Sequence, residues 1–457
     1  MMWLHALRVA RPRQAAGRAT RPLRRRRFPA GPGGALRPLD ANEALWRSPA
    51  FAPSGSAPDA GSRLAPFEHH YGADVLEAAR TGGDPARLAA AWSVEHPPRA
   101  GDAWHPYTAS TRAANWIAAA TLDPSLAPAV EEGVRRALAR VAANVEDDVL
   151  GNHVIRNAVA LVLGGVAFDD RSLRRRGEEL LARELPEQVL PDGGHYERSP
   201  AYHRLVLRDL ISVRAFVDVE DPVTRMLAFA AASSRPDGAP WLFNDGGLDV
   251  APTLQLDVPG DGVQIFPETG YVFVRRGDVA LAFDCGPVSP AFLPAHAHAD
   301  GLSFQLWSNG KPFVVDPGMP TYEAGPERDF FRSTQAHSTV AVGGSQFESW
   351  GAFRAGPLPQ VELIEVSAEG ATGRVATARG EHLRRLRIED DAVVVEDETH
   401  GGDAVSTLVL AREVEIDAAA ELTAQEAVLA ERLGERLPIR ALVQRGTRSP
   451  TWRIPLG

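Results

Sequence analysis

Apolar residues recur at helical spacing through the first half of the chain. One stripe has intervals of 4, 4, 3 and 4 residues and would lie on a single helix face: Val130, Val134, Leu138, Val141 and Val145. Similar patterns predict helices at 85–93, 110–121, 153–164, 171–185 and 203–217. Such an array of amphipathic helices, from about 73 to 233, predicts a bundle, a solenoid or a helical toroid. The lack of a fixed-period repeat weakens the solenoid option.

The pattern changes to a period of two from about residue 262. Residues 271–274 alternate, 276–278 form a turn signal and 279–283 resume the alternation, which predicts a β-hairpin. Further strands are expected at 302–308, 312–316, 338–343, 383–389 and 392–396. Short strands separated by Gly and Asp turns predict an antiparallel β-sandwich. Helices followed by strands give an α+β chain with a cleft between its two lobes.

Composition excludes several classes of protein. The 457 residues contain 49 basic and 59 acidic side chains, for a formal net charge of −10. No apolar run approaches the roughly 20 residues of a transmembrane helix, so we expect no transmembrane segment. The single cysteine, Cys285, rules out an intrachain disulfide and a multi-cysteine metal site. Any metal must therefore be held by His, Asp or Glu.

Basic charge is concentrated at the start of the chain. Residues 1–39 contain ten arginines, including the run Arg24 to Arg27, and no Asp or Glu. We favour a poorly ordered or loosely docked leader over an arm that binds an anionic partner, and we expect no nucleic-acid partner. No secretory signal pattern is evident, which favours a cytoplasmic location. The predicted divisions are a basic arm and irregular linker at 1–66, a helical domain at 67–250 and a sandwich at 251–457.

The densest group of candidate ligands lies in the second half. His296 and His298 are spaced i, i+2 and would share one face of a strand. Asp316 follows an apolar strand, and His337 opens another. Two imidazoles and a carboxylate suit zinc. The competing explanation is that each residue caps a turn, which for Asp316 before Pro317 is about as plausible.

The helical half offers a second group. Asn152 and His153 begin a helix, where Asn commonly serves as the N-cap. In the segment 192–203, Ser199 and Pro200 form an N-cap and N1 pair, and Tyr202 occupies the first turn, where the helix dipole favours a phenolate. Taken alone, Tyr202 is equally explained as a core aromatic. Three further side chains suit a carbohydrate or anion cleft but also suit helix packing: Trp104, Tyr107 and Arg112.

These segments together resemble the heparinase II/III family of polysaccharide lyases. The matching runs are 296–304, 315–318 and 336–340 in the second half, and 152–153 and 192–203 in the first. The resemblance implies an incomplete α/α toroid joined to an antiparallel β-sandwich, with the active cleft between them. It also implies an acidic polysaccharide or oligosaccharide substrate.

The resemblance assigns roles to individual residues. Asn152 matches the residue that neutralises the substrate carboxylate, and His153 its active-site neighbour. Tyr202 and His296 match the catalytic tyrosine and histidine, while Glu197 falls within the matched segment and is taken with the three cleft residues as substrate-binding. The ligands of a structural zinc are matched by His298, Asp316 and His337.

The sequence leaves three functions open besides the lyase. The lyase would remove the C5 proton of a uronic acid and expel the C4 oxygen, with Tyr202, His296 or His153 as base. A glycoside hydrolase on a helical toroid needs two carboxylates, for which Glu197 and Asp245 are the candidates. A non-catalytic accessory protein of surface-polysaccharide biosynthesis would only bind glycans. Nucleic-acid binding through the arm would depend strongly on salt.

Overall fold

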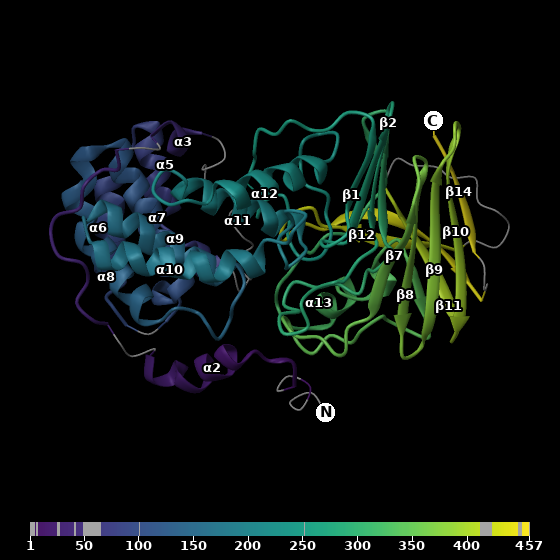
Figure 1. The fold of residues 1–457 in the computed structure, drawn as a ribbon, viewed down its shortest axis with the longest axis horizontal. Helices are drawn as coiled ribbons and strands as arrows, with labels where there is room; N and C mark the ends of the chain where they lie inside the picture. Colours follow the sequence, from purple (N-terminus) through teal and green to yellow (C-terminus); the bar gives the residue numbers. More distant parts are fainter. Residues whose placement is uncertain are drawn as a thin grey trace.

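The computed structural model describes the chain except for residues 1–4, 6–7, 25–27, 41–42, 49–64, 100, 251, 412–422, 447–449 and 457. Figure 1 shows a helical lobe beside a lobe of strands, with one separate helix below the helical lobe. The order of helices and strands is that expected for an α+β chain. Within the described residues, no helix is both long and apolar enough to cross a membrane.

The helical lobe is an incomplete α/α toroid. Its predicted helices are confirmed, although the last of them ends earlier, at Val213. Proline at the first helical position begins several of them, as expected from its fixed φ. The α-helices are α3 (Glu43–Arg47), α4 (Ala65–Glu68), α5 (Ala73–Thr81), α6 (Pro85–Glu95), α7 (Pro106–Leu122), α8 (Ala127–Ala143), α9 (Asn152–Ala167), α10 (Arg171–Gln188), α11 (Pro200–Val213) and α12 (Glu220–Ala232).

Helix α9 forms the centre of this lobe. It packs against α7, α8, α10 and α11. Its sequence is apolar on nearly every face, which is the pattern of a fully enclosed helix. Its N-terminus carries Asn152 and His153, so the best-enclosed helix of the lobe supports these two side chains.

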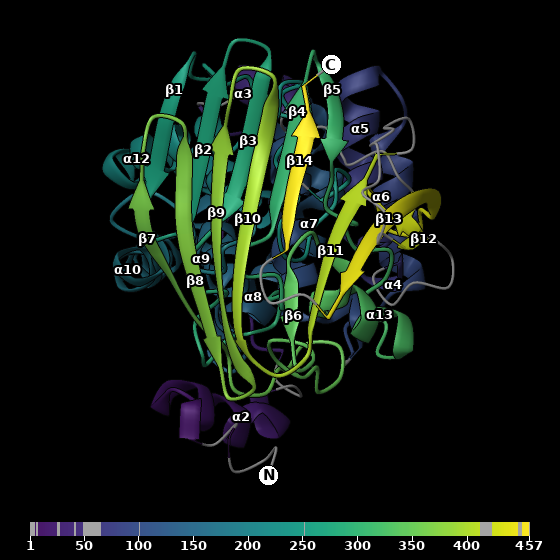
Figure 2. The ribbon, with the colours of Figure 1, turned by 90° about the vertical axis from the view of Figure 1, so that its right-hand side faces the viewer.

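The second lobe is an antiparallel β-sandwich of two sheets, seen in Figure 2. One sheet has the order β1-β2-β3-β4-β5-β11-β13-β12, with β6 paired to β11, and the other has the order β14-β10-β9-β8-β7. The strands are β1 (Gly262–Phe266), β2 (Tyr271–Arg276), β3 (Val279–Asp284), β4 (Phe304–Ser308), β5 (Lys311–Val314), β6 (Val340–Val342), β7 (Gln360–Val366), β8 (Gly370–Thr377), β9 (Gly380–Ile388), β10 (Ala392–Gly401), β11 (Ala404–Leu410), β12 (Thr423–Leu429), β13 (Leu437–Arg445) and β14 (Thr451–Pro455).

The predicted hairpin is formed by β2 and β3, with Arg276 opposite Val279 at the turn. An aromatic cluster joins this hairpin to the helical lobe, and includes Phe229, Trp241, Tyr271 and Phe273. The loop 285–303 and the short helix α13 (Pro326–Phe331) lie on the side of the sandwich that faces the toroid (Figure 1). This interface fixes the two lobes against each other.

The arginine-rich arm is better ordered than the sequence indicates. Residues Pro12–Arg24 form helix α2, which docks on the rest of the protein. Arg13 pairs with Glu184 at 2.5 Å, and Arg21 pairs with Asp148 at 2.9 Å. The expectation of a loose leader is therefore wrong for this helix, because acidic side chains of the toroid neutralise it. Arg25 to Arg27 and much of the 40–66 linker lie outside the described residues.

Candidate active site

Tyr202 and His296 meet between the lobes. Their rings stack with centroids 3.9 Å apart and an angle of 27° between the planes. Tyr202 lies in the first turn of α11, where the Ser199 side chain accepts the Tyr202 backbone N–H as the predicted N-cap. His296 lies in the loop 285–303, so the expectation of a strand at this position is wrong. The cap on one lobe and the loop on the other bring the phenol and the imidazole together.

Two carboxylates hold the His296 ring from opposite sides. Asp245 Oδ2 lies 3.0 Å from Nδ1, and Glu197 Oε2 lies 3.3 Å from Nε2. Asp245 is fully buried and also receives both terminal nitrogens of Arg328 and Nε2 of His298. Although burial opposes ionisation, Arg328 and the two histidines hold the pKa of Asp245 well below its usual value. Asp245 is thus a buried anion that orients His296.

This arrangement contradicts the hydrolase alternative. A hydrolase needs two carboxyl groups that flank the bond to be cleaved. Here Glu197 and Asp245 are both buried and both contact the same imidazole. Asp245 is shielded by Arg328 and His298, so it has no path to a sugar or to an attacking water molecule.

Tyr202 is held as a neutral phenol. Its hydroxyl lies 3.3 Å from that of Tyr322, a residue of the sandwich lobe. Burial, with further contributions from Tyr322 and Asp245, raises the pKa of Tyr202 well above its usual value. The resting site therefore presents a proton donor at this position. The sequence argument for a phenolate at the helix N-terminus is outweighed by burial and by the nearby negative charge.

Asn152 lies against Glu197. The side-chain amide of Asn152 is 3.2 Å from Glu197 Oε1, and the backbone N–H of Asn152 donates to the same oxygen at 2.8 Å. The N-cap of α9 is Gly151, not Asn152, and its φ is 62°. A Cβ at Gly151 would lie 2.3 Å from Glu197 Oε1, so only glycine allows this close approach. Despite its burial, Glu197 keeps a lowered pKa because of His296, His195 and the Asn152 N–H.

His153 is partly exposed and paired. Its Nδ1 lies 2.9 Å from Glu146 Oε1, and its ring centroid lies 4.5 Å from that of Tyr107. Burial disfavours the imidazolium, but Glu146 outweighs it and raises the pKa of His153. In turn His153 and His105 overcome the burial of Glu146 and lower its pKa to about 2. His153 therefore carries positive charge beside Asn152 at mildly acidic pH.

Two of the predicted cleft residues lie elsewhere. Arg112 is fully buried between the rings of Trp92 and Trp104, and it donates to the carbonyl oxygens of His70 and Ala103. Trp104 is 2% exposed and donates to the carbonyl of His96. Both stabilise the helical core, so the prediction that they bind substrate is contradicted. Tyr107 and Glu197 do lie at the site, beside His153 and Asn152.

A metal-ligand group lies directly behind His296. One ligand atom each of His298, Asp300 and His337 lies within 4.8 Å of the others, and all three residues are buried. His298 Nδ1 and both carboxylate oxygens of Asp300 have no hydrogen-bond partner. Asp316 Oδ2 lies 2.8 Å from His337 Nδ1, while His337 Nε2 contacts the Phe331 carbonyl at 2.9 Å.

These donors fit a divalent cation. The Phe331 carbonyl accepts Nε2–H of His337. The other ring nitrogen, Nδ1, faces Asp316 and carries either a second proton, in the imidazolium, or a lone pair, in the neutral ring. A cation would replace the proton, and it would also satisfy His298 Nδ1 and the Asp300 carboxylate, whose isolation is otherwise costly. The donor set of imidazoles and carboxylates is one that zinc accepts. Asp300 is absent from the predicted ligand set, although its i+2 spacing from His298 is the signal that singled out His296.

Three other residues of the site carry no local sequence signal. The sequence offers Asp245 only as a hydrolase carboxylate, and no motif marks Tyr322 or Arg328. All three come from loops or a short helix at the lobe interface, and they reach the site through the tertiary fold. Glu146, which supports His153, is likewise recognisable only from its burial.

Comparison with known proteins gives two domain matches in this chain. The Heparinase II/III N-terminus domain matches residues 136–268, and the Heparinase II/III-like, C-terminal domain matches residues 259–452. A heparin-sulfate lyase of Bacteroides stercoris is 24% identical over 243 residues, which are 43% of this chain and 36% of that protein. FtsZ-localized protein C of Caulobacter vibrioides is 28% identical over 262 residues, which are 50% of this chain and 44% of that protein. The matches thus span less than half the length of these curated relatives.

Solved structures share the fold. The crystal structure of heparinase III aligns with a TM-score of 0.68 at 16% identity, over 97% of this chain and 89% of that one. A chondroitin AC lyase of Streptomyces coelicolor A3 aligns with a TM-score of 0.56 at 12% identity, over 91% and 79%. Together the two domain matches run from residue 136 to residue 452 and include every residue of the Tyr202–His296 site described above except Tyr107. The chain belongs to the heparinase II/III family.

Proposed function

We propose that the protein is a polysaccharide lyase that cleaves a uronic-acid-containing glycan by β-elimination. The observation that carries the proposal is the stacking of Tyr202 on His296, with Asn152 and His153 beside them. A neutral phenol, an imidazole and two donors for a carboxylate are the groups that this reaction needs. The heparin-sulfate and chondroitin lyases among the similar proteins support the same class of substrate.

The carboxylate of the sugar would be held by Asn152 and His153. The Asn152 amide carries two hydrogens, and its contacts to Glu197 are long, at 3.2 and 3.4 Å, so one N–H is available to a substrate. The positive charge of His153 would stabilise the enolate-like state that forms when the C5 proton leaves.

His296 and Tyr202 would carry the two protons. Asp245 accepts Nδ1–H of His296, so Nε2 is the ring atom that would take the C5 proton. Nε2 faces Glu197 Oε2 at 3.3 Å, so the substrate would have to displace this contact, and Glu197 would then stabilise the imidazolium. The C5–H electrons form the C4=C5 double bond, the C4–O bond breaks, and the phenol of Tyr202 gives its proton to the leaving oxygen. No water is consumed. On a syn substrate, Tyr202 would instead act as both base and acid, after its own phenolic proton has passed to His296.

The metal would have a structural role. With a cation held by its Nδ1, the His298 ring would keep its proton on Nε2, the atom that lies 2.9 Å from Asp245. Asp245 in turn orients His296. His298, Asp300 and His337, with Asp316 beside them, would hold zinc in this position, away from the sugar.

The test is the appearance of an unsaturated uronate. Purified protein is incubated with heparan sulfate, chondroitin sulfate and bacterial uronate polysaccharides, and the ultraviolet absorbance of the product is followed. Tyr202→Phe and Tyr322→Phe serve as the matched pair, since both remove one hydroxyl of the same contact. The proposal expects product from the wild type and from Tyr322→Phe, and product formation that is about 10²–10⁴-fold slower from Tyr202→Phe.

A binding protein without turnover is the second candidate. The Caulobacter relative is named for its localization with FtsZ and not for a lyase activity. Under this alternative, a uronate glycan would bind, and neither the wild type nor any variant would produce an unsaturated end. Calorimetry combined with the absorbance assay separates the two functions.

A further inference from the structure

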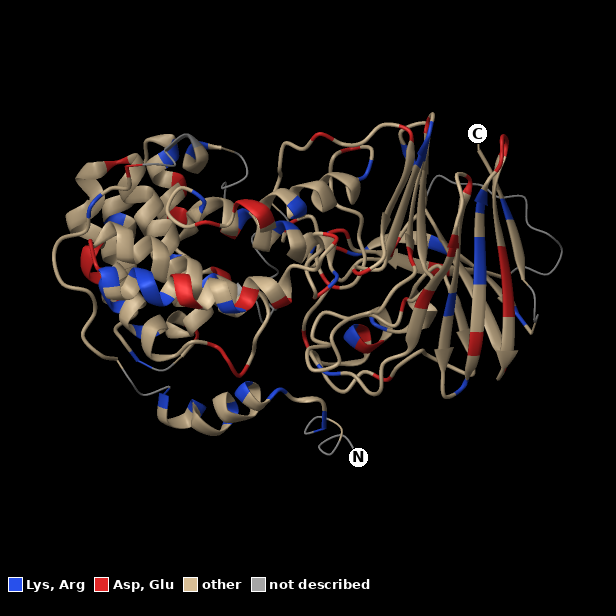
Figure 3. Ribbon diagram, viewed as in Figure 1, with Lys and Arg blue, Asp and Glu red and all other residues tan. Residues whose placement is uncertain are grey.

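Helix α2 ties the two lobes together next to the site. On the toroid side, Arg13 pairs with Glu184, and Arg21 with Asp148. On the sandwich side, the Gln14 amide reaches the Phe292 carbonyl at 3.4 Å, and the Arg11 guanidinium lies 4.4 Å from the Phe292 ring. Figure 3 shows the basic α2 directly below an acidic loop of the toroid. The helix therefore crosses from one lobe to the other.

Two loops that α2 and the preceding residue His5 contact also carry residues of the site. The toroid loop that carries Asp148 continues into Asn152 and His153 and contains Glu146. On the sandwich, residue His5 ahead of α2 packs edge-on against Trp350, with ring centroids 5.5 Å apart. That loop also carries Phe353, which is 41% exposed and whose ring lies 6.5 Å from that of His296. The helix and the residues ahead of it thus contact both lobes close to the loops that carry His153 and Phe353.

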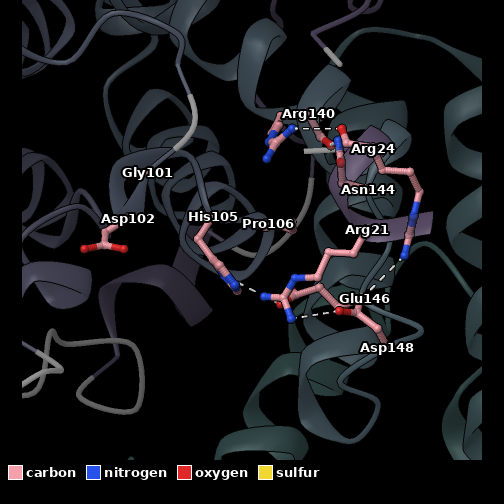
Figure 4. Close-up of a pocket in the computed structure, with 10 residues that line it drawn as sticks. All are labelled: Arg21, Arg24, Gly101, Asp102, His105, Pro106, Arg140, Asn144, Glu146 and Asp148. Carbon is pink, nitrogen blue, oxygen red and sulfur yellow. Dashed lines mark hydrogen bonds and ion pairs between the residues drawn. The ribbon is translucent and has the colours of Figure 1, made fainter. Parts of the chain in front are cut away.

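Little space remains beneath the helix. Figure 4 shows the cavity between α2 and the toroid, lined by Arg21, Arg24, His105 and Glu146 among others. Its volume is about 140 Å³, whereas small-molecule pockets typically have about 300–1,000 Å³. Gly17 lies so close to this loop that a Cβ would be 2.8 Å from the Asp148 backbone nitrogen. A continuous polysaccharide has no passage below α2.

The helix also brings cationic charge to the cleft. Arg18 is exposed and follows Gln14 by one helical turn, on the side that faces the sandwich. A guanidinium at this position is suited to an acidic group of a bound glycan.

We propose that α2 is a cap on one end of the substrate cleft, so that the protein acts on the end of an acidic polysaccharide chain, and that Arg18 binds an acidic group of the terminal sugars. This inference rests on the proposed function, because it assumes that the cleft holds a glycan. It makes α2 a determinant of specificity: an open cleft would bind anywhere along a chain, and a capped cleft binds once per end.

Binding stoichiometry tests the cap without turnover. Tyr202→Phe protein is titrated by calorimetry with size-fractionated heparan sulfate and chondroitin sulfate chains. The cap predicts one bound protein per chain whatever the chain length. In the same background, Gly17→Leu should lift α2 from the Asp148 loop, and the number bound should then rise with length. Ala19→Leu, at an exposed position of the same helix, is the control and should behave like the parent.

Arg18 is tested in the same titration. Arg18→Ala should weaken binding about tenfold, whereas Arg385→Ala, which removes an exposed arginine on β9, should not. A number of bound molecules that rises with chain length in the parent protein would overturn the cap. Binding of one protein per chain with no unsaturated product from the wild type would reject the lyase and keep the cap. If neither glycan binds, both proposals fail.

Discussion

The Tyr202 ring stacks on the His296 imidazole at 3.9 Å, and the two side chains come from different lobes. Packing of the two lobes against each other therefore assembles the proton donor with its partner. Tyr202→Phe keeps the stacked ring and removes only the hydroxyl. We expect turnover to fall by about 10²–10⁴-fold, the usual contribution of acid–base catalysis.

The folded state should be little affected by Tyr202→Phe, because the lost contact to Tyr322 is a 3.3 Å hydrogen bond. Steady-state kinetics and urea unfolding measure both quantities. Comparable turnover by wild type and Tyr202→Phe would remove Tyr202 from the mechanism.

Asp245 is expected to position His296. Asp245→Asn leaves the buried Arg328 without its anion, so we expect a loss of about 3–5 kcal/mol in the free energy of unfolding. It should also lower kcat by about 10–100-fold with a small change in KM, since the His296 ring loses its orienting partner.

A matched control exists elsewhere in the sandwich. Asp397 is also buried and accepts from Arg384 and His382. Asp397→Asn should cost similar stability and leave kcat unchanged for the fraction that remains folded. Equal effects of the two variants on kcat would show that Asp245 has only a structural role.

Stability should depend on pH through the Glu146–His153 pair. The pKa of Glu146 is lowered to about 2, so its contribution is present above about 4.5, its unfolded value, and is lost as the pH falls toward 2. The pKa of His153 is raised, so its contribution is complete below about 6.5 and is lost as the pH rises through the folded pKa.

Glu146→Gln removes both contributions. The difference in unfolding free energy between wild type and this variant should be largest between about pH 4.5 and 6.5, at about 1–3 kcal/mol, and should shrink on both sides. Chemical denaturation across the pH range measures it. A difference independent of pH would mean that the pair is not ionised in the folded protein.

The His298 cluster should hold one divalent cation per chain. Elemental analysis of protein purified without chelators measures the content, and removal of the metal should lower the melting temperature. Asp300→Asn and Asp316→Asn distinguish the two carboxylates: the variant that loses the metal identifies the ligand. Protein that is free of metal before any chelator is added would contradict the assignment.

The sequence predicts the helix N-cap before Tyr202 correctly but not the loop that holds His296. Ser199 and Pro200 form a local signal, and the structure confirms the helix that they begin and the position of Tyr202 in its first turn. His296 and His298 were expected on a strand. They lie in a loop, and they share a face because both contact Asp245.

The sequence does not predict the roles of residues whose positions depend on tertiary contacts. Arg112 has the charge of an anion-binding residue, but it is enclosed between the rings of Trp92 and Trp104. Tyr322 and Arg328 lie in segments without a chemical pattern and reach the site only because the sandwich folds against the toroid. The arm was expected to be loose because its sequence shows its own charge and not the acidic surface of the toroid that pairs with it.

The most direct test of the central claim is cleavage in isotopically labelled water. The glycan that gives the largest product signal is digested, and the new chain ends are examined by mass spectrometry. Elimination through His296 and Tyr202 predicts ends with no solvent oxygen and one unsaturated uronate per cleavage. Incorporation of one labelled oxygen per cleavage, without an unsaturated uronate, would show hydrolysis and contradict the account.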